Sequence, residues 1–226
     1  MKNFPKSEFI QFLVCKDCYT FLMNTNPQTH ARFEVYDFPH RGIRNALSLW
    51  ILETGKTDFK NEEEWNRLKN MSTDIIHLLE IHARDEEAFS LKYLGEIDPS
   101  YSEKDLTNHS LLEKEIETIQ SRLEQIDRSK PLSKADLKKE FYNTLMRFQT
   151  RYLVHMEEEE TVTQSHLWKE FSDAELENHR KEIMASLKVE DLKLWIRYVA
   201  PTLPSEERFK FESMTEKILS QSSGKN

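Results

Sequence analysis

Apolar residues recur at intervals of three and four along most of the chain from residue 37 to residue 163. This spacing places them on one face of an α-helix, which is typical of a helix packed against a core. Local signals mark the helix ends, with Asp37 and Asn61 as N-caps, Gly55 as a terminating glycine and Pro131 as a break. The pattern predicts four long helices, over about residues 37–55, 61–94, 102–127 and 133–162.

Segments on both sides of these helices also favour helical structure. An apolar stretch over residues 7–22 predicts a helix before the first long one. Ser172 and Glu175 have the spacing of a capping box, which begins a helix to about Leu187, and shorter helices are predicted over 190–199 and 205–219. We therefore predict an all-α chain with an up-down-up-down four-helix bundle. Its predicted parts are an N-terminal helical segment (1–35), the bundle (36–164), a C-terminal helical extension (165–219) and a disordered tail (220–226).

Composition excludes several classes of protein. Only 4 of 226 residues are glycine, and neither a dinucleotide-binding nor a P-loop glycine motif is present. The net charge of −8 opposes binding to nucleic acid or to an anionic membrane surface, so we expect neither partner. Two cysteines cannot build a disulfide framework, and no apolar run is long enough to span a membrane. A cytoplasmic location is the expectation from these features.

Histidine and glutamate occur together more often than chance predicts. Five histidines are followed four residues later by a glutamate, where about one such pair is expected by chance, and this spacing puts both side chains on one helix face. Three of the pairs fall on three successive predicted bundle helices, and a further histidine, His40, falls on the remaining one. The five pairs are His30/Glu34, His82/Glu86, His109/Glu113, His155/Glu159 and His166/Glu170.

The histidines also agree in height along the predicted bundle. At a rise of about 1.5 Å per residue, His82, His109 and His155 lie within roughly 3 Å of the same level, and His40 fits less closely. Carboxylates buried together are prohibitively costly unless a cation lies between them. Imidazoles and carboxylates that converge inside a helical bundle are therefore typical of a transition-metal pair.

The order and spacing of these ligand-bearing segments resemble those of the hemerythrin-like (HHE cation-binding) family, over about residues 36–163. The stretch from Leu194 to Arg208 is similar to the helical extension on some bacterial members. The segments that carry the resemblance are Phe38-Pro-His40, His82-Ala-Arg-Asp-Glu86, His109-Ser-Leu-Leu-Glu113 and His155-Met-Glu-Glu-Glu159.

The resemblance implies a non-haem di-iron centre with a defined ligand set. One iron would take His40 and His82, and the other His109 and His155, with Glu86 and Glu159 as bridging carboxylates. Glu160 competes with Glu159, because the last carboxylate of the family lies four or five residues after its histidine. Glu113 falls where oxygen-carrying members place a further histidine, and we expect it as an additional ligand.

A carboxylate at position 113 would add negative charge and favour the ferric state. Such a site favours oxygen activation, peroxide reduction or sensing over reversible oxygen carriage. From the resemblance we expect a protein that binds or senses dioxygen or related small redox ligands such as nitric oxide. The alternatives are a di-iron oxidoreductase, either an oxygenase or a peroxide-reducing enzyme, and a metal-free helical interaction module. Manganese or zinc could replace iron in such a ligand set. The C-terminal helices could cap the centre, form a homodimer or bind a protein partner.

Five other side chains carry weaker signals. Tyr36 could line the entrance of the centre and Arg44 could pair with a carboxylate, or both could serve packing and surface ion pairing. His77 points away from His82 and is expected outside the centre. Cys15-Lys-Asp-Cys18 lacks the two further ligands of a zinc site, so core packing is favoured over a redox relay.

Overall fold

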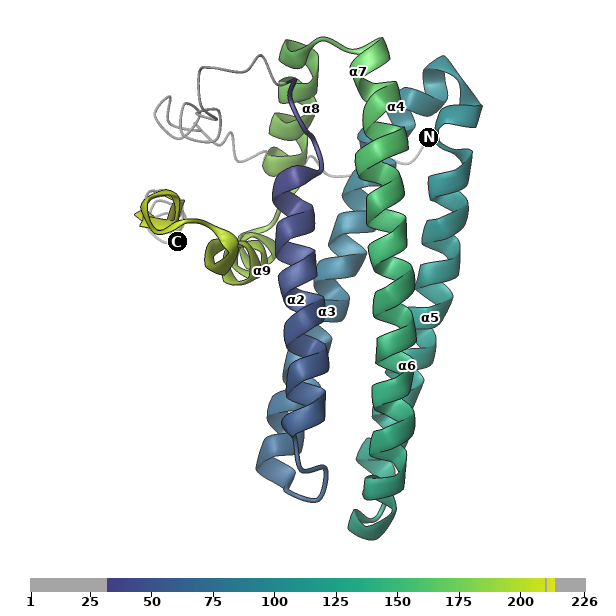
Figure 1. Cartoon of the computed structure of the whole chain (residues 1–226), viewed down its shortest axis with the longest axis vertical. Coiled ribbons are helices and arrows are strands. Elements are labelled where there is room, and N and C mark those ends of the chain that lie inside the picture. The colour runs from purple at the N-terminus through teal and green to yellow at the C-terminus, as the bar shows by residue number, and fades with distance from the viewer. Residues whose placement is uncertain (1–31, 210, 214–226) are drawn as a thin grey trace, which may run out of the picture.

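The structure is a computed structural model that describes residues 32–209 and 211–213 (Figure 1). This part of the chain is helical with no strand, so the prediction of an all-α protein is confirmed. The predicted N-terminal helix with Cys15 and Cys18, the residue His30 and the tail 220–226 lie outside the described residues. Residues 205–209 and 211–213 are helical, as predicted for the beginning of the last helix.

Four long helices lie side by side, and consecutive ones run in opposite directions (Figure 1). The helix α2 packs against α3 and α6, and α5 packs against the same two helices. Short links join α2 to α3 and α5 to α6 at the lower end of Figure 1. The bounds of the four helices are Asp37–Lys56 (α2), Glu62–Ala88 (α3), Glu103–Arg128 (α5) and Pro131–Glu158 (α6).

The predicted helix ends at the lower end of the molecule agree closely with the structure. The Asn61 side chain accepts hydrogen bonds from the backbone N–H groups of Glu63 and Glu64, as its predicted role as N-cap requires. At the upper end Asp37 is the first helical residue and Tyr36 holds the cap position, so the predicted N-cap there is wrong by one residue. These ends depend on local chemistry, which is why the sequence locates them to within about two residues.

Two predicted helices are interrupted near the upper end. The helix predicted over 61–94 breaks at Phe89, whose φ of −125° and ψ of −83° separate α3 from α4 (Ser90–Ile97). The helix predicted over 133–162 changes at Glu159 into a π-helix, η2 (Glu159–Thr163), before α7 (Gln164–Glu170). A single inserted residue of this kind leaves no mark in an apolar periodicity, and π-helical turns are frequent at functional sites.

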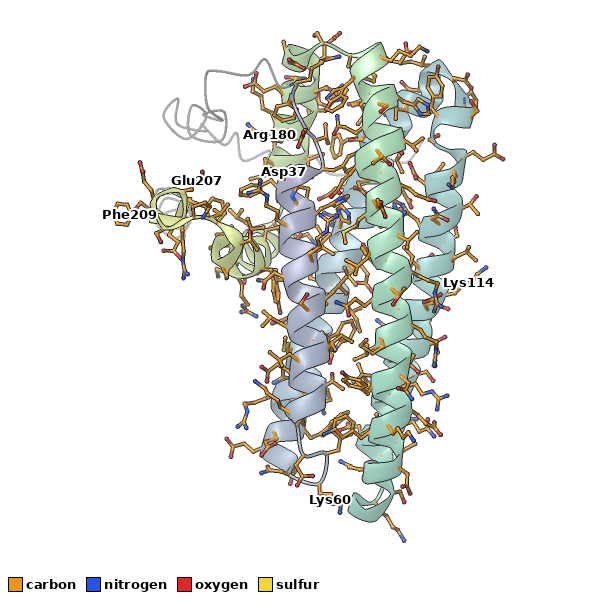
Figure 2. All side chains as sticks on the ribbon, in the orientation of Figure 1. Asp37, Lys60, Lys114, Arg180, Glu207 and Phe209 are labelled. Carbon is orange, nitrogen blue, oxygen red and sulfur yellow. The ribbon has the colours of Figure 1, made fainter. Side chains whose placement is uncertain are left out.

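The main core fills the lower part of the space between the four long helices, where side chains meet from all of them (Figure 2). The largest of its fully buried members are Trp50, Trp65, Phe59, Phe141 and Phe148. The Trp50 indole N–H donates to Ser72 Oγ at 2.8 Å, so its polar atom is satisfied. A smaller apolar cluster lies toward the upper end, around Tyr36, Leu94, Leu167 and Leu176.

The chain after α7 forms α8 (Asp173–Ser186) and α9 (Val189–Val199), and the predicted capping box of Ser172 and Glu175 is confirmed. The helix α9 packs across α2 and α3. A Cβ atom at Gly42 would lie 2.6 Å from Val199 Cγ2, so glycine permits this close approach. Two 3₁₀ turns, η1 (Pro99–Tyr101) and η3 (Ala200–Thr202), complete the described elements.

Within the described residues, no helix combines the length and the apolar character that crossing a membrane requires.

Candidate metal centre

The long helices bring six of the seven predicted ligands together inside the molecule. The helix α2 carries one, α3 carries two, α5 and α6 carry one each, and η2 begins with the sixth. All six are buried, with exposed fractions between 0 and 5%, which is unusual for side chains of this polarity. They are His40, His82, Glu86, His109, His155 and Glu159.

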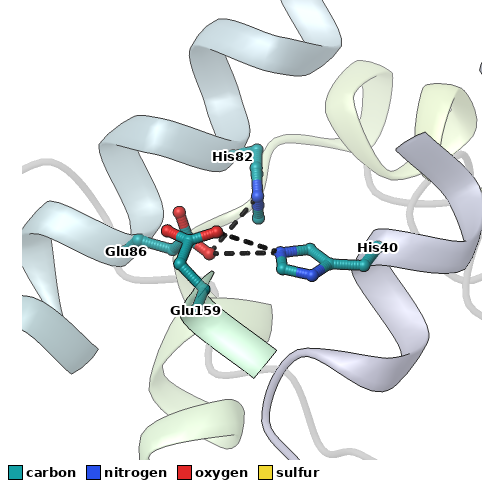
Figure 3. A group of neighbouring side chains, drawn as sticks. All are labelled: His40, His82, Glu86 and Glu159. Carbon is teal, nitrogen blue, oxygen red and sulfur yellow. Dashed lines mark ion pairs between the residues drawn. The ribbon is translucent and has the colours of Figure 1, made fainter. Parts of the chain in front are cut away.

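These residues form two groups of four that share both carboxylates. Glu86 and Glu159 join the imidazoles of His40 and His82 in one group, which Figure 3 shows. The same two carboxylates join the imidazoles of His109 and His155 in the other. Within each group the potential ligand atoms lie within 4.8 Å of one another.

Each carboxylate turns one oxygen toward each pair of imidazoles. Glu86 Oε1 lies 3.3 Å from His82 Nε2 and 3.7 Å from His40 Nε2, whereas its Oε2 lies 3.4 Å from His109 Nε2. Glu159 Oε2 lies 3.4 Å from His40 Nε2, and its Oε1 lies 3.4 Å from His109 Nε2 and 3.2 Å from His155 Nε2. This is the orientation that a carboxylate needs to bridge two ions.

None of these facing atoms has a hydrogen-bond partner. The four Nε2 atoms and all four carboxylate oxygens are buried and form no hydrogen bond, which costs a protein considerable free energy unless another ligand satisfies them. Two ligands that are each about 2.1 Å from one ion, at an angle of 90–110°, lie roughly 3.0–3.4 Å apart. Five of the six separations fall in that range, and the sixth, 3.7 Å between Glu86 Oε1 and His40 Nε2, is slightly longer, so the residues fit a pair of metal ions.

Without bound metal ions, protons on two of the histidines balance the negative charges of the two carboxylates. Burial lowers the pKa of His40, but the carboxylates of Glu159, Glu160 and Glu86 outweigh it and raise the pKa to about 10. Burial also lowers the pKa of His109, but Glu159 and Glu86 outweigh it and raise the pKa to about 11. Two imidazolium ions thus face two carboxylates, and bound divalent metals would displace those protons.

The other two histidines and the two carboxylates complete this picture. Burial lowers the pKa of both His82 and His155, so these rings are neutral. Burial raises the pKa of Glu86, but His109 and His40 reverse this and hold it at about 2. Burial and the charge of Glu86 raise the pKa of Glu159, yet contacts with His109 and His40 leave it below its ordinary value.

Glu160 supports the centre from outside. Its Oε1 lies 2.8 Å from His40 Nδ1, and Arg44 donates to both of its oxygens at 2.7 and 2.8 Å. Glu160 therefore orients the His40 ring, and Glu159 is the carboxylate that both groups share. Of the roles considered for Arg44, the structure shows pairing with the carboxylate of Glu160. In the same way, Glu87 Oε1 lies 3.0 Å from His109 Nδ1 and orients the His109 ring, which the sequence did not predict.

The structure does not bring Glu113 to the centre. Its side chain is exposed, and it belongs to neither group. Four residues correspond to about 400° of rotation along a helix, so a residue at this spacing is turned about 40° from its partner. On α5 that turn carries Glu113 outward, between the buried Leu112 and Ile116. The expectation of a ligand at position 113, and of the charge it would add, is corrected.

Other predicted positions lie where expected or away from the centre. His77 is half exposed and its Nε2 lies 2.9 Å from Asp191 Oδ1, outside the centre as predicted. The His166 ring stacks on Tyr101 and joins neither group. Tyr36 does line the centre, because its ring stacks on that of His40 with centroids 5.1 Å apart.

Two pockets of the described surface lie away from the centre. One is lined by residues near the lower end, among them Glu53 and Arg67. The other lies between α4 and α5, beside Gly95 and Leu106. Neither includes a residue of the centre, so neither offers a large substrate a route to it.

Comparison with known proteins gives a partial relationship. F-box/LRR-repeat protein 5 of Bos taurus is 24% identical over 184 residues, which cover 79% of this chain and 25% of that protein. The F-box/LRR-repeat protein 5 of Pongo abelii matches over the same length with the same identity. The chain thus spans about a quarter of the length of the curated relatives it matches. No protein-family model matches the chain.

Proposed function

We propose that this chain is a hemerythrin-like protein whose six buried ligands hold two iron ions and bind or sense dioxygen or a related small redox ligand. In this proposal α2, α3, α5 and α6 form an up-down-up-down four-helix bundle. The observation that carries it is the sharing of Glu86 and Glu159 between two pairs of imidazoles. A single ion would not need two carboxylates with one oxygen turned to each side.

The choice of iron follows from the chemistry of the donors. Each ion would take two imidazoles and an oxygen from each of two carboxylates, a mixed set suited to iron and also to manganese or zinc. Iron, when bound, supplies a metal that binds dioxygen and exchanges electrons. The chain's own residues exclude water, keep the carboxylates between the imidazoles, and orient His40 and His109 through Glu160 and Glu87.

The surroundings favour a small ligand over an organic substrate. An enzyme that acts on an organic molecule needs an apolar pocket that opens beside the metals, and the two surface pockets described above are lined by other residues. The metal-free interaction module is also less well supported. It would leave the facing nitrogens and oxygens of six buried side chains without hydrogen bonds and would not explain why they converge.

The test is the metal content of the full chain purified without oxygen, measured by mass spectrometry, followed by visible absorption when air is admitted. We expect two irons per chain and new near-ultraviolet and visible bands. Bands that persist and reverse on removing oxygen indicate binding, and bands that decay with turnover indicate an enzyme. His82→Ala and His155→Ala should each lose iron while remaining folded. A folded wild-type chain without stoichiometric metal would refute the proposal.

A further inference from the structure

A layer of buried polar residues lies directly above the ligands, toward the end of the molecule at which α2 begins (Figure 1). Each member is four residues from a ligand, on the upper side of it. Their exposed fractions are 1 to 3%, so contact with bulk solvent is not the reason that polar residues occupy these positions. We name these four the polar layer: Tyr36 beside His40, Ser90 beyond Glu86, Asp105 before His109 and Thr163 beyond Glu159.

The layer on the lower side of the ligands has the opposite character. Ile43, Leu78 and Leu112 are buried there, and Tyr152 turns the edge of its ring toward His155, with centroids 5.9 Å apart. The main apolar core continues directly below these residues. A small polar ligand on the metals would therefore find four polar side chains on the upper side, whereas the Tyr152 hydroxyl is the polar group among these lower residues.

Two hydroxyl groups of the polar layer have no partner. Thr163 Oγ1 donates to Asp105 Oδ2, so that pair is satisfied. The hydroxyls of Tyr36 and Ser90 are buried and unpaired. A buried hydroxyl without a partner is costly, and in a site built for a ligand the ligand supplies that partner.

Tyr36 is the better placed of the two donors. Its ring stacks on the imidazole of His40 at an interplanar angle of 27°, which fixes the phenol beside a ligand of the first group. Ser90 follows the break at Phe89, and its shorter side chain begins a different helix. A phenol is protonated at neutral pH and donates one hydrogen bond through its O–H.

We propose that the polar layer is the binding position of the exogenous small ligand and that the Tyr36 hydroxyl donates a hydrogen bond to it. The inference rests on the proposed function, because the ligand binds to the metals. Four side-chain donors per ion leave positions open on an ion that takes six. The ligand is a small anion or diatomic molecule with an atom that accepts a hydrogen bond. The hydrogen-bonded pair of Asp105 and Thr163 forms the other side of this binding position and restricts the size of the ligand.

The experiment is an azide titration of the iron-loaded full chain, followed by visible absorption, in the wild type, Tyr36→Phe and Tyr152→Phe. Both substitutions remove only a phenol oxygen, but Tyr152 lies in the lower layer, so it is a matched control. We expect Tyr36→Phe to weaken azide binding about tenfold or more, because a hydrogen bond to an anion is lost. Tyr152→Phe should leave azide affinity within about twofold of the wild type.

A second measurement is infrared spectroscopy of bound azide, in which Tyr36→Phe is compared with the wild type. The infrared stretch of bound azide should shift between H₂O and D₂O, since the donor is an exchangeable O–H, and the shift should be absent in Tyr36→Phe. Metal content is measured in every sample.

Several results would overturn the inference. Unchanged azide affinity in iron-loaded Tyr36→Phe, an equal loss in both variants, or loss of iron from Tyr36→Phe would each remove the proposed donor role. Absence of metal from the wild type would refute the proposed function itself, so the two failures are distinguishable.

Discussion

The lower and upper parts of the helical assembly bury very different residues. Below the ligands, aromatic and aliphatic side chains fill the core, and the buried Trp50 and Trp65 indoles both have acceptors, Ser72 and Asp127. At the ligand level and above it lie all the buried side-chain nitrogens and oxygens that lack a hydrogen-bond partner among the described residues. Eight of these atoms are the facing Nε2 and carboxylate atoms of the centre.

This difference indicates two sources of stability in one fold. The lower part is stabilised by burial of apolar surface, worth roughly 25 cal/mol per Å². The upper part contains two carboxylates and four imidazoles at close range, and its stability depends on what satisfies them. The lower part thus provides a rigid frame, and the upper part is where a ligand can change the energy of the protein.

The largest effect is expected from the shared carboxylate. Glu159→Gln keeps the shape of the side chain but removes the negative charge that faces both imidazole pairs. We expect the loss of both metals, because a neutral amide cannot bridge two cations in a buried site. Metal content by mass spectrometry checks this, and a variant that retains two ions per chain would contradict the shared role.

The apolar part should respond in the opposite way. Phe141 is fully buried and lies 14 residues from His155 on α6, about 21 Å along the helix. Phe141→Ala should lower the free energy of unfolding by about 3–5 kcal/mol. Metal content should stay unchanged, since the cavity is remote from the ligands. Denaturant unfolding measures the free energy, and mass spectrometry measures the metal content. Loss of metal from Phe141→Ala would show that the two parts are not independent.

Removal of metal should weaken the upper part selectively. A ligand at 100 times its dissociation constant stabilises the native state by about 2.7 kcal/mol, and tighter binding gives more. Treatment with a chelator should therefore lower Tm, and hydrogen exchange should rise first around His40 and His109. Equal exchange rates in the loaded and the chelated protein would show that the metals do not support this part.

The residues that orient the histidines should have smaller effects. Glu160→Gln removes the charge that holds His40 Nδ1 and Arg44. We expect metal affinity to fall about 10–100-fold with the fold intact. The exposed neighbour Glu157 offers a matched control, and Glu157→Gln should leave the affinity unchanged. Competition with a chelator of known affinity compares the variants. Equal metal affinities of the two variants would show that Glu160 forms only a surface ion pair and does not support His40.

The smallest effect is expected at Glu113. Because its side chain is exposed, Glu113→Ala should change the free energy of unfolding by less than about 0.5 kcal/mol and leave metal content unchanged. Loss of one ion from this variant would restore the ligand role that the sequence predicted and contradict the outward orientation of the side chain.

Local chemistry made much of the fold predictable. The apolar spacing located the long helices, and the N-cap at Asn61 and the capping box of Ser172 and Glu175 located their beginnings. The spacing of histidine and glutamate identified five of the six residues that lie together in the centre, and the resemblance to a known family added His40. The break at Phe89 and the π-helix at Glu159 were not predictable, because each changes the helix by about one residue without altering its composition.

By itself, the sequence determined which residues share a face of each helix, since that depends only on the helical repeat. The choice between Glu159 and Glu160, the outward turn of Glu113 and the burial of Tyr36, Asp105 and Thr163 were decided only by the tertiary structure. These outcomes depend on how far each helix is rotated about its own axis against its neighbours. That rotation follows from the packing of whole faces together, and no single segment of the chain contains it.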